Sequence, residues 1–80
     1  MSIVDVLAAK LAEDTVKAMD EMNEERLFVE VGDILAASSQ SLEEAYLMEV
    51  RVRLAERLAR KHLVDKVKDF RMAKSRPKPE

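Results

Sequence analysis

The chain has 80 residues, of which 38% are charged, and it contains one histidine and no cysteine. A domain this short buries so little surface that a single hydrophobic core supplies only ~3–5 kcal/mol of stability. Disulfides are excluded as a further source, and we do not expect a structural zinc site because His62 is the only nitrogen ligand of the kind zinc prefers. We therefore expect the chain to gain stability by associating with a partner, most simply a second copy of itself.

Apolar residues are scattered along the chain in runs of only a few residues. A membrane-spanning helix needs about 20 predominantly apolar residues, so we expect no membrane segment. Residues 1–5 lack the basic and then apolar order that is typical of a signal peptide. Together with the absence of cysteine, this pattern favours a cytoplasmic location.

The net charge of −2 conceals a strong asymmetry along the chain. Residues 1–50 carry three basic and twelve acidic side chains, which gives this segment a net charge of −9. Residues 51–80 carry eleven basic and four acidic side chains, which gives a net charge of +7. Two interpretations follow: the segments neutralise each other within an assembly, or the basic segment binds an external polyanion.

The first predicted element is an amphipathic helix over residues 3–22. Ser2 is a suitable N-cap, and Asp5 places a carboxylate in the first turn, where the helix dipole favours it. Apolar residues then recur at intervals of three and four, which is typical of a helix with one buried face.

A second helix is predicted over residues 24–37. The apolar positions after Asn23 no longer continue the first stripe, and Asn23 followed by two glutamates resembles a helix start. Residues 27–31 are rich in β-branched and aromatic side chains, so a short extended segment is the alternative. We favour the helix because a lone strand would have no partner to pair with.

A third, long helix is predicted over residues 42–72. Ser41 and Glu44 form the pattern of a capping box, and no proline interrupts the chain before Pro77. We expect residues 1–72 to form one helical domain. Residues 73–80 contain two prolines and no apolar period, which predicts a disordered basic tail.

The long helix carries two apolar stripes side by side. We call the first the alanine-rich stripe; its members are Ala45, Met48, Val52, Ala55, Ala59, Leu63 and Phe70. We call the second the leucine stripe; its members are Leu47, Val50, Leu54 and Leu58. Two stripes need neighbours on two sides, more than two short helices of one chain readily supply. We therefore predict an all-α bundle completed by homodimerisation, with the leucine stripe at the interface, although a higher oligomer fits the same pattern.

Basic residues form another stripe on the same helix. They are Arg53, Arg57, Arg60, Lys61, Lys68 and Arg71. A row of positive charge of this kind can follow the phosphates of a nucleic acid. Glutamates four residues before Arg53 and Arg60 indicate instead a solvated face with intrahelical ion pairs. A helix-turn-helix arrangement fits poorly, because the third helix begins with Glu43 and Glu44 where DNA readers contact the duplex.

Catalytic and metal-binding patterns are weak in this sequence. His62 precedes Asp65 by three residues, but no serine or cysteine nucleophile lies at an evident spacing from it. Neighbouring carboxylates such as Glu24 and Glu25 diverge around a helix and do not converge on one ion. We predict no catalytic residue, no cofactor and no metal site. The sequence favours a regulatory or adaptor module that binds itself and a further protein, with dimeric nucleic-acid binding as the alternative.

Overall fold

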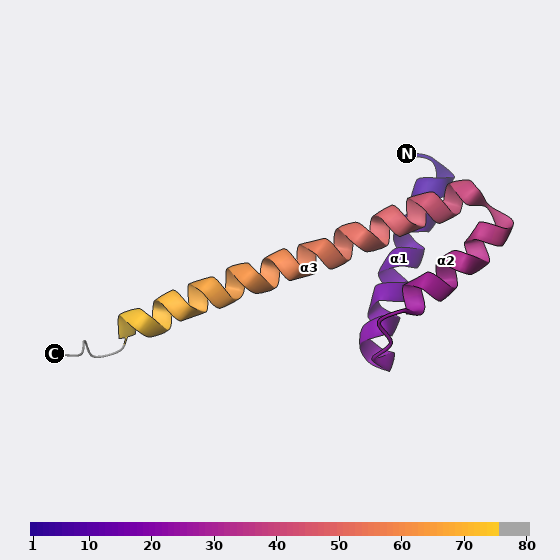
Figure 1. The fold of residues 1–80 in the computed structure, drawn as a ribbon. Coiled ribbons are helices and arrows are strands. Elements are labelled where there is room, and N and C mark those ends of the chain that lie inside the picture. The colour runs from indigo at the N-terminus through magenta and orange to yellow at the C-terminus, as the bar shows by residue number, and fades with distance from the viewer. Residues whose placement is uncertain (76–80) are drawn as a thin grey trace.

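The computed structural model describes residues 1–75, and within this range the only regular structure is three helices. These are α1 (Ile3–Met22), α2 (Leu27–Ser38) and α3 (Gln40–Ser75). Helices α1 and α2 both lie against the N-terminal portion of α3, and the rest of α3 projects far beyond them (Figure 1). The molecule is 66 Å long with a radius of gyration of 18.4 Å, whereas a compact chain of this length has one of about 12 Å.

Helix α1 has the bounds that the sequence predicts. The Ser2 hydroxyl accepts a hydrogen bond from the Asp5 N–H at 3.2 Å, which satisfies one of the free donors of the first turn. The helix ends at Asn23, whose backbone is left-handed with φ 54°. The N–H groups of Asn23 and Glu24 both donate to the Met19 carbonyl. Asparagine tolerates this conformation better than most residues, so Asn23 turns the chain.

Helix α2 begins at Leu27, three residues later than predicted. The prediction assigned Asn23 to the start of the second helix, but this residue terminates the first one, and the chain needs residues 24–26 as a turn. Residues 27–31 are helical, which confirms the helix over the extended alternative. Gly32 is buried against α3, where a side-chain Cβ would come within 3.4 Å of the Leu47 Cδ2.

Helix α3 is capped by Ser39 and not by Ser41 as the sequence predicted. The Ser39 hydroxyl accepts a hydrogen bond from the Leu42 N–H at 3.2 Å, and its own N–H closes α2 on the Leu35 carbonyl. One residue with an extended backbone therefore ends one helix and starts the next. Helix α3 continues through Ser75, so the first three residues of the predicted tail are helical, and residues 76–80 lie outside the described range.

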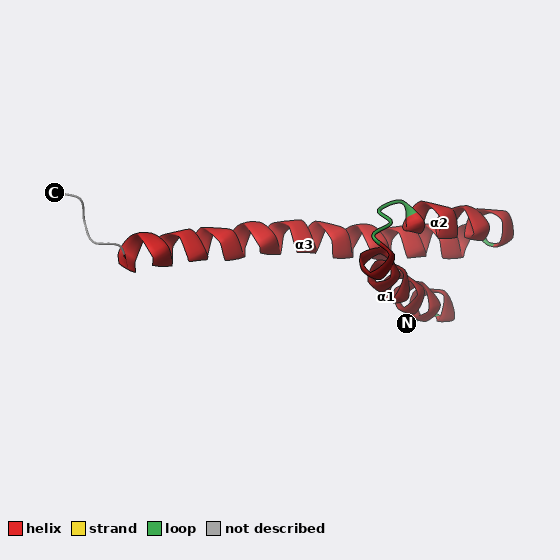
Figure 2. Cartoon of the chain, turned by 90° about the horizontal axis from the view of Figure 1, so that it is seen from below, coloured by secondary structure: helices red, strands yellow, loops and turns green. Residues whose placement is uncertain are grey.

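The hydrophobic core lies where α1 crosses α3 and α2 doubles back along it (Figure 2). Its fully or almost fully buried members are Ala8, Ala12, Val16, Tyr46 and Val50. The alanines let α1 approach α3 closely, because a helix pair comes nearer where its contact residues are small. The Tyr46 hydroxyl donates to the Phe28 carbonyl at 3.0 Å, which ties α3 to α2.

This packing divides the molecule into two regions, which we call the head (residues 1–57) and the arm (residues 58–75 of α3). The head holds the whole core, whereas every arm residue from 58 to 74 is exposed. None of the helices in the described range combines the length and apolarity needed to cross a membrane.

Candidate interaction surface

The arm exposes large apolar side chains without support from α1 or α2. Leu58 is 74% exposed, Phe70 64% and Leu63 58%. The arm is about 27 Å long at roughly 1.5 Å per residue. Most helices in proteins are stabilised by packing of their apolar face, so an arm of this length presents a surface suited to another chain.

The alanine-rich stripe is the apolar surface that joins the head to the arm. Met48 and Val52 of the head are 64% and 61% exposed, and the small side chains of Ala55 and Ala59 that follow are also open. The stripe then continues through Leu63 to Phe70. One side of α3 is therefore uncovered from the head to the far end of the arm, on the face that α1 and α2 leave free.

The leucine stripe has a different environment. Val50 is completely buried in the chain's own core, and Leu47 and Leu54 are partly buried against that core. Only Leu58 remains open. The chain's own core therefore takes up most of the leucine stripe, whereas the alanine-rich stripe is exposed from Met48 onward.

Two members of the basic stripe lie in the head and bind α1. Arg57 donates two hydrogen bonds to the carboxylate of Asp20 on α1, at 2.8 and 2.7 Å. Arg53 is partly buried, pairs with Glu49 at 2.6 Å and reaches the Ala9 carbonyl of α1 at 3.4 Å. Both arginines therefore fix the crossing of α1 and α3.

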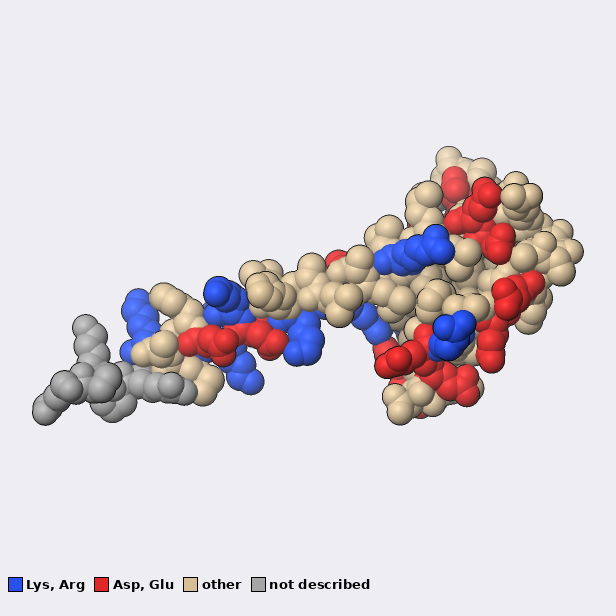
Figure 3. Space-filling view, viewed as in Figure 1, with Lys and Arg blue, Asp and Glu red and all other residues tan. Residues whose placement is uncertain are grey.

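The other basic residues of the stripe lie on the arm. Arg60 pairs with Glu56 at 2.6 Å and Lys61 with Asp65 at 3.0 Å, both across one helical turn. Lys68 and Arg71 make no ion pair within residues 1–75. Figure 3 shows the result: acidic side chains gather over the head, and basic ones predominate along the arm.

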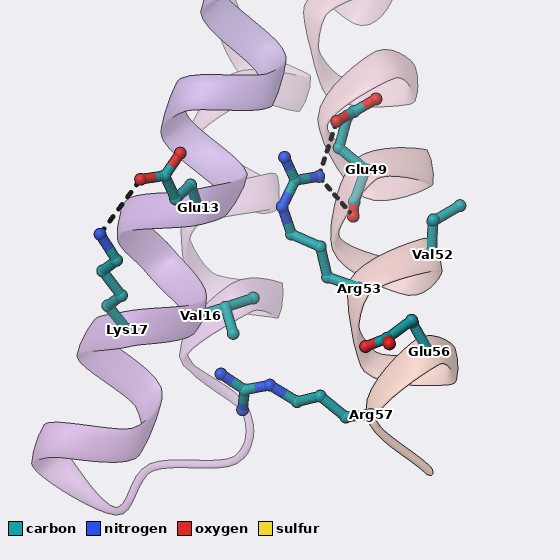
Figure 4. Close-up of a pocket in the computed structure, with 8 residues that line it drawn as sticks. All are labelled: Glu13, Val16, Lys17, Glu49, Val52, Arg53, Glu56 and Arg57. Atoms are coloured by element: carbon teal, nitrogen blue, oxygen red, sulfur yellow. Dashed lines mark hydrogen bonds and ion pairs between the residues drawn. The ribbon is translucent and has the colours of Figure 1, made fainter. Parts of the chain in front are cut away.

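A groove of about 560 Å³ runs between α1 and α3, beside the alanine-rich stripe (Figure 4). Val16 and Val52 supply its apolar side chains, and the rest of the lining is charged. The lining residues are Glu13, Val16, Lys17, Glu49, Val52, Arg53, Glu56 and Arg57. The contribution of α1 was missed in the sequence, because no local pattern shows where one helix crosses another.

Hydrogen bonds with opposite charges and burial shift the pKa values of several groups in the head. The hydrogen bond from Arg57 lowers the pKa of Asp20, and the same bond raises the pKa of the Arg57 guanidinium. The hydrogen bond from Lys17 likewise lowers the pKa of Glu13. Burial raises the pKa of the Tyr46 phenol. Each shift reinforces the charge state that the group has near neutral pH, so these groups support the structure.

His62, the only candidate general base in the sequence, is exposed on the arm. Asp65, which could have oriented its ring, pairs with Lys61 at 3.0 Å instead. Among the described residues, no hydrogen bond or ion pair joins His62 to Asp65.

The arrangement can present one long apolar helical face, flanked by charges, to another helix. No family model, no curated protein and no solved structure matches this chain. Its function therefore has to be inferred from the surface itself.

Proposed function

We propose that the chain is a small helical protein-interaction module that acts as a homodimer, with regulatory or adaptor character. One observation carries the proposal: the alanine-rich stripe is open from Met48 in the head to Phe70 in the arm. Proteins that stay monomeric rarely leave so extended an apolar surface in water. A second copy brings the same surface and can cover it in a symmetric interface.

The small size of the head supports the same proposal. Of its fully buried side chains, only Tyr46 and Val50 are large, and the core around them includes two alanines. Association would add buried apolar area to this modest core, and it would stabilise the folded chain because only the folded chain binds. The arm would become part of a packed interface in the same step.

Binding of a nucleic acid has less support. Four of the six basic-stripe residues are engaged by carboxylates of the same chain, which leaves Lys68 and Arg71. Phosphate binding draws its affinity from several free cations in a row, and it weakens steeply as salt increases.

Sedimentation equilibrium of the wild type and two matched variants tests the proposal. Leu63→Asp places a charge on the alanine-rich stripe, and Val64→Asp places the same charge about 100° further around the arm, outside the stripe. The two residues are adjacent and similarly exposed, at 58% and 53%. We expect a wild-type dimer at micromolar concentration, a Kd raised at least about tenfold by Leu63→Asp, and little change with Val64→Asp.

A wild-type chain that stays monomeric at these concentrations contradicts the proposal. If Leu63→Asp and Val64→Asp raise the dimer Kd equally, the dimer interface does not lie on the alanine-rich stripe.

A further inference from the structure

The alanine-rich stripe supplies a row of positions that can lie opposite one another when two copies of α3 meet. With Lys66 and Ala73, which lie on the same side of α3, the stripe occupies positions 45, 48, 52, 55, 59, 63, 66, 70 and 73. The intervals are three, four, three, four, four, three, four and three residues, the same in either direction. Ala59 stands at the centre.

We infer that the second copy binds antiparallel along α3, with Ala59 of both chains at the twofold axis. This inference rests on the proposed homodimer and adds its orientation and register. Any straight helical face has a spacing of this kind, so the spacing shows only that every stripe position can lie opposite another one. The orientation is selected by the side chains at these positions and by the charges beside them. The arm of each chain then lies on the head of the other.

In this register, small side chains lie near the centre of the stripe, and the two larger ones, Met48 and Phe70, lie further out. Met48 faces Phe70 of the second copy, and the small Ala55 faces the larger Leu63. Ala59 faces itself, so the two helices can approach closely where they cross. Val52 faces the aliphatic stem of Lys66, whose ammonium group can extend to water.

The overall charges favour the antiparallel orientation. The head carries six basic and thirteen acidic residues, a net charge of −7, and the arm carries six basic and two acidic ones, a net charge of +4. An antiparallel pair places the basic arm of each copy beside the acidic head of the other copy, and these opposite charges attract. A parallel pair would bring the two acidic heads together at one end.

Individual charges beside the stripe match in the same register. Arg51 comes opposite Asp69 on one flank, and Glu49 comes opposite Arg71 on the other. Among the described residues, Arg51, Asp69 and Arg71 form no ion pair within their own chain. The dimer would therefore give partners to charges that the single chain leaves without one.

The groove between α1 and α3 lies on the flank of Glu49. In this register, Val67 of the second copy comes opposite the position between Glu49 and Arg53. An apolar side chain there would meet Val16 and Val52 in the groove. The groove is thus part of the same interface, and its occupant is the arm.

Disulfide formation between introduced cysteines tests the orientation, because the chain has no cysteine of its own. Met48→Cys and Phe70→Cys variants are prepared separately, mixed under reducing conditions and then oxidised. We expect about a tenfold or greater excess of the mixed disulfide, because bridged residues must lie within about 7 Å between Cα atoms. In an antiparallel pair, position 48 of one chain would be about 33 Å from position 48 of the other.

Two further variants serve as controls. Ala59→Cys forms a disulfide with itself in either orientation and shows that the stripes meet, whereas Val64→Cys, which lies outside the stripe, does not. A homodisulfide of Met48→Cys in excess over the mixed product overturns the antiparallel inference and leaves the dimer intact. A dimer in sedimentation that yields no stripe disulfide also overturns the register. A monomer in sedimentation removes the proposed function itself.

Discussion

The two halves of α3 belong to one continuous helix but are held in different ways. In the head, α1 and α2 bury one side of α3, and Tyr46 and Val50 are completely enclosed. In the arm, the ion pairs of Arg60 with Glu56 and of Lys61 with Asp65 both lie within the helix. Such pairs add only ~0.2–0.5 kcal/mol each. The head is therefore stabilised by its own tertiary packing, whereas the arm has apolar surface that no other part of the described chain covers.

The largest expected effect separates the two halves directly. Val50→Asp places a charge in the enclosed core, so we expect a loss of more than about 3 kcal/mol in the free energy of unfolding, and with it most of the folded head. Val64→Asp in the arm should change the stability of the single chain by less than about 0.5 kcal/mol. Urea unfolding followed by circular dichroism measures both. Equal stability of the two variants would show that Val50 is not a core residue.

A charge exchange sharpens the comparison at the contact between head and arm. The proposed dimer contains the contact between residues 51 and 69 twice, once on each side of the twofold axis. Arg51→Asp and Asp69→Arg each replace the attraction at both contacts by repulsion between like charges, so each should raise the dimer Kd about fivefold. The double variant should restore the wild-type Kd. Dilution calorimetry at low salt measures the dimer Kd of all four proteins. If the double variant loses as much affinity as the two single variants together, residues 51 and 69 do not face each other in the dimer.

Gly32→Ala tests how closely α2 approaches α3 in the head. An added Cβ would lie 3.4 Å from Leu47 and 3.7 Å from Tyr46, which are ordinary contact distances. Alanine is favoured over glycine inside a helix, so we expect the free energy of unfolding to rise by ~0.5–1 kcal/mol. Thermal unfolding measures the gain, and a lower melting temperature would mean that the two helices lie closer than this.

The smallest expected effect concerns pH and the Asp20–Arg57 pair. The Arg57 hydrogen bond lowers the pKa of Asp20 in the folded chain below its value in the unfolded chain. The Asp20–Arg57 pair therefore stabilises the folded chain fully above the ordinary aspartate pKa of about 4. This stabilisation disappears as the pH falls through the lower pKa that Asp20 has in the folded chain. The melting temperature of the wild type should exceed that of Asp20→Asn near pH 7, and the difference should shrink below about pH 4. If the difference in melting temperature between the two proteins does not change with pH, the ionised Asp20–Arg57 pair is not its cause.

The sequence predicts those features of the fold that depend on neighbouring residues. The bounds of α1 follow from the Ser2 cap and from the break at Asn23. The prediction places the same asparagine in the wrong helix, because asparagine serves both as an N-cap and as a left-handed C-terminal residue. The predicted start of α3 is wrong because Ser39 and Ser41 offer identical hydroxyls, and only the path of the chain selects Ser39.

Features that depend on the crossing of helices could not be predicted. Helical periodicity shows two apolar stripes on α3, but it does not tell which one α1 and α2 cover. Tyr46 belongs to neither stripe and is nevertheless one of the two largest fully buried side chains. Asp20 lies 37 residues from Arg57 in the chain, and no local pattern connects them.

Amide hydrogen exchange of the arm at two protein concentrations tests the central claim most directly. The head should protect its amides at both concentrations, because its core belongs to the single chain. The arm amides should be protected at a concentration well above the dimer Kd and exchange rapidly well below it. Rapid exchange in the arm at every concentration, beside a protected head, would contradict the claim that a second copy covers it.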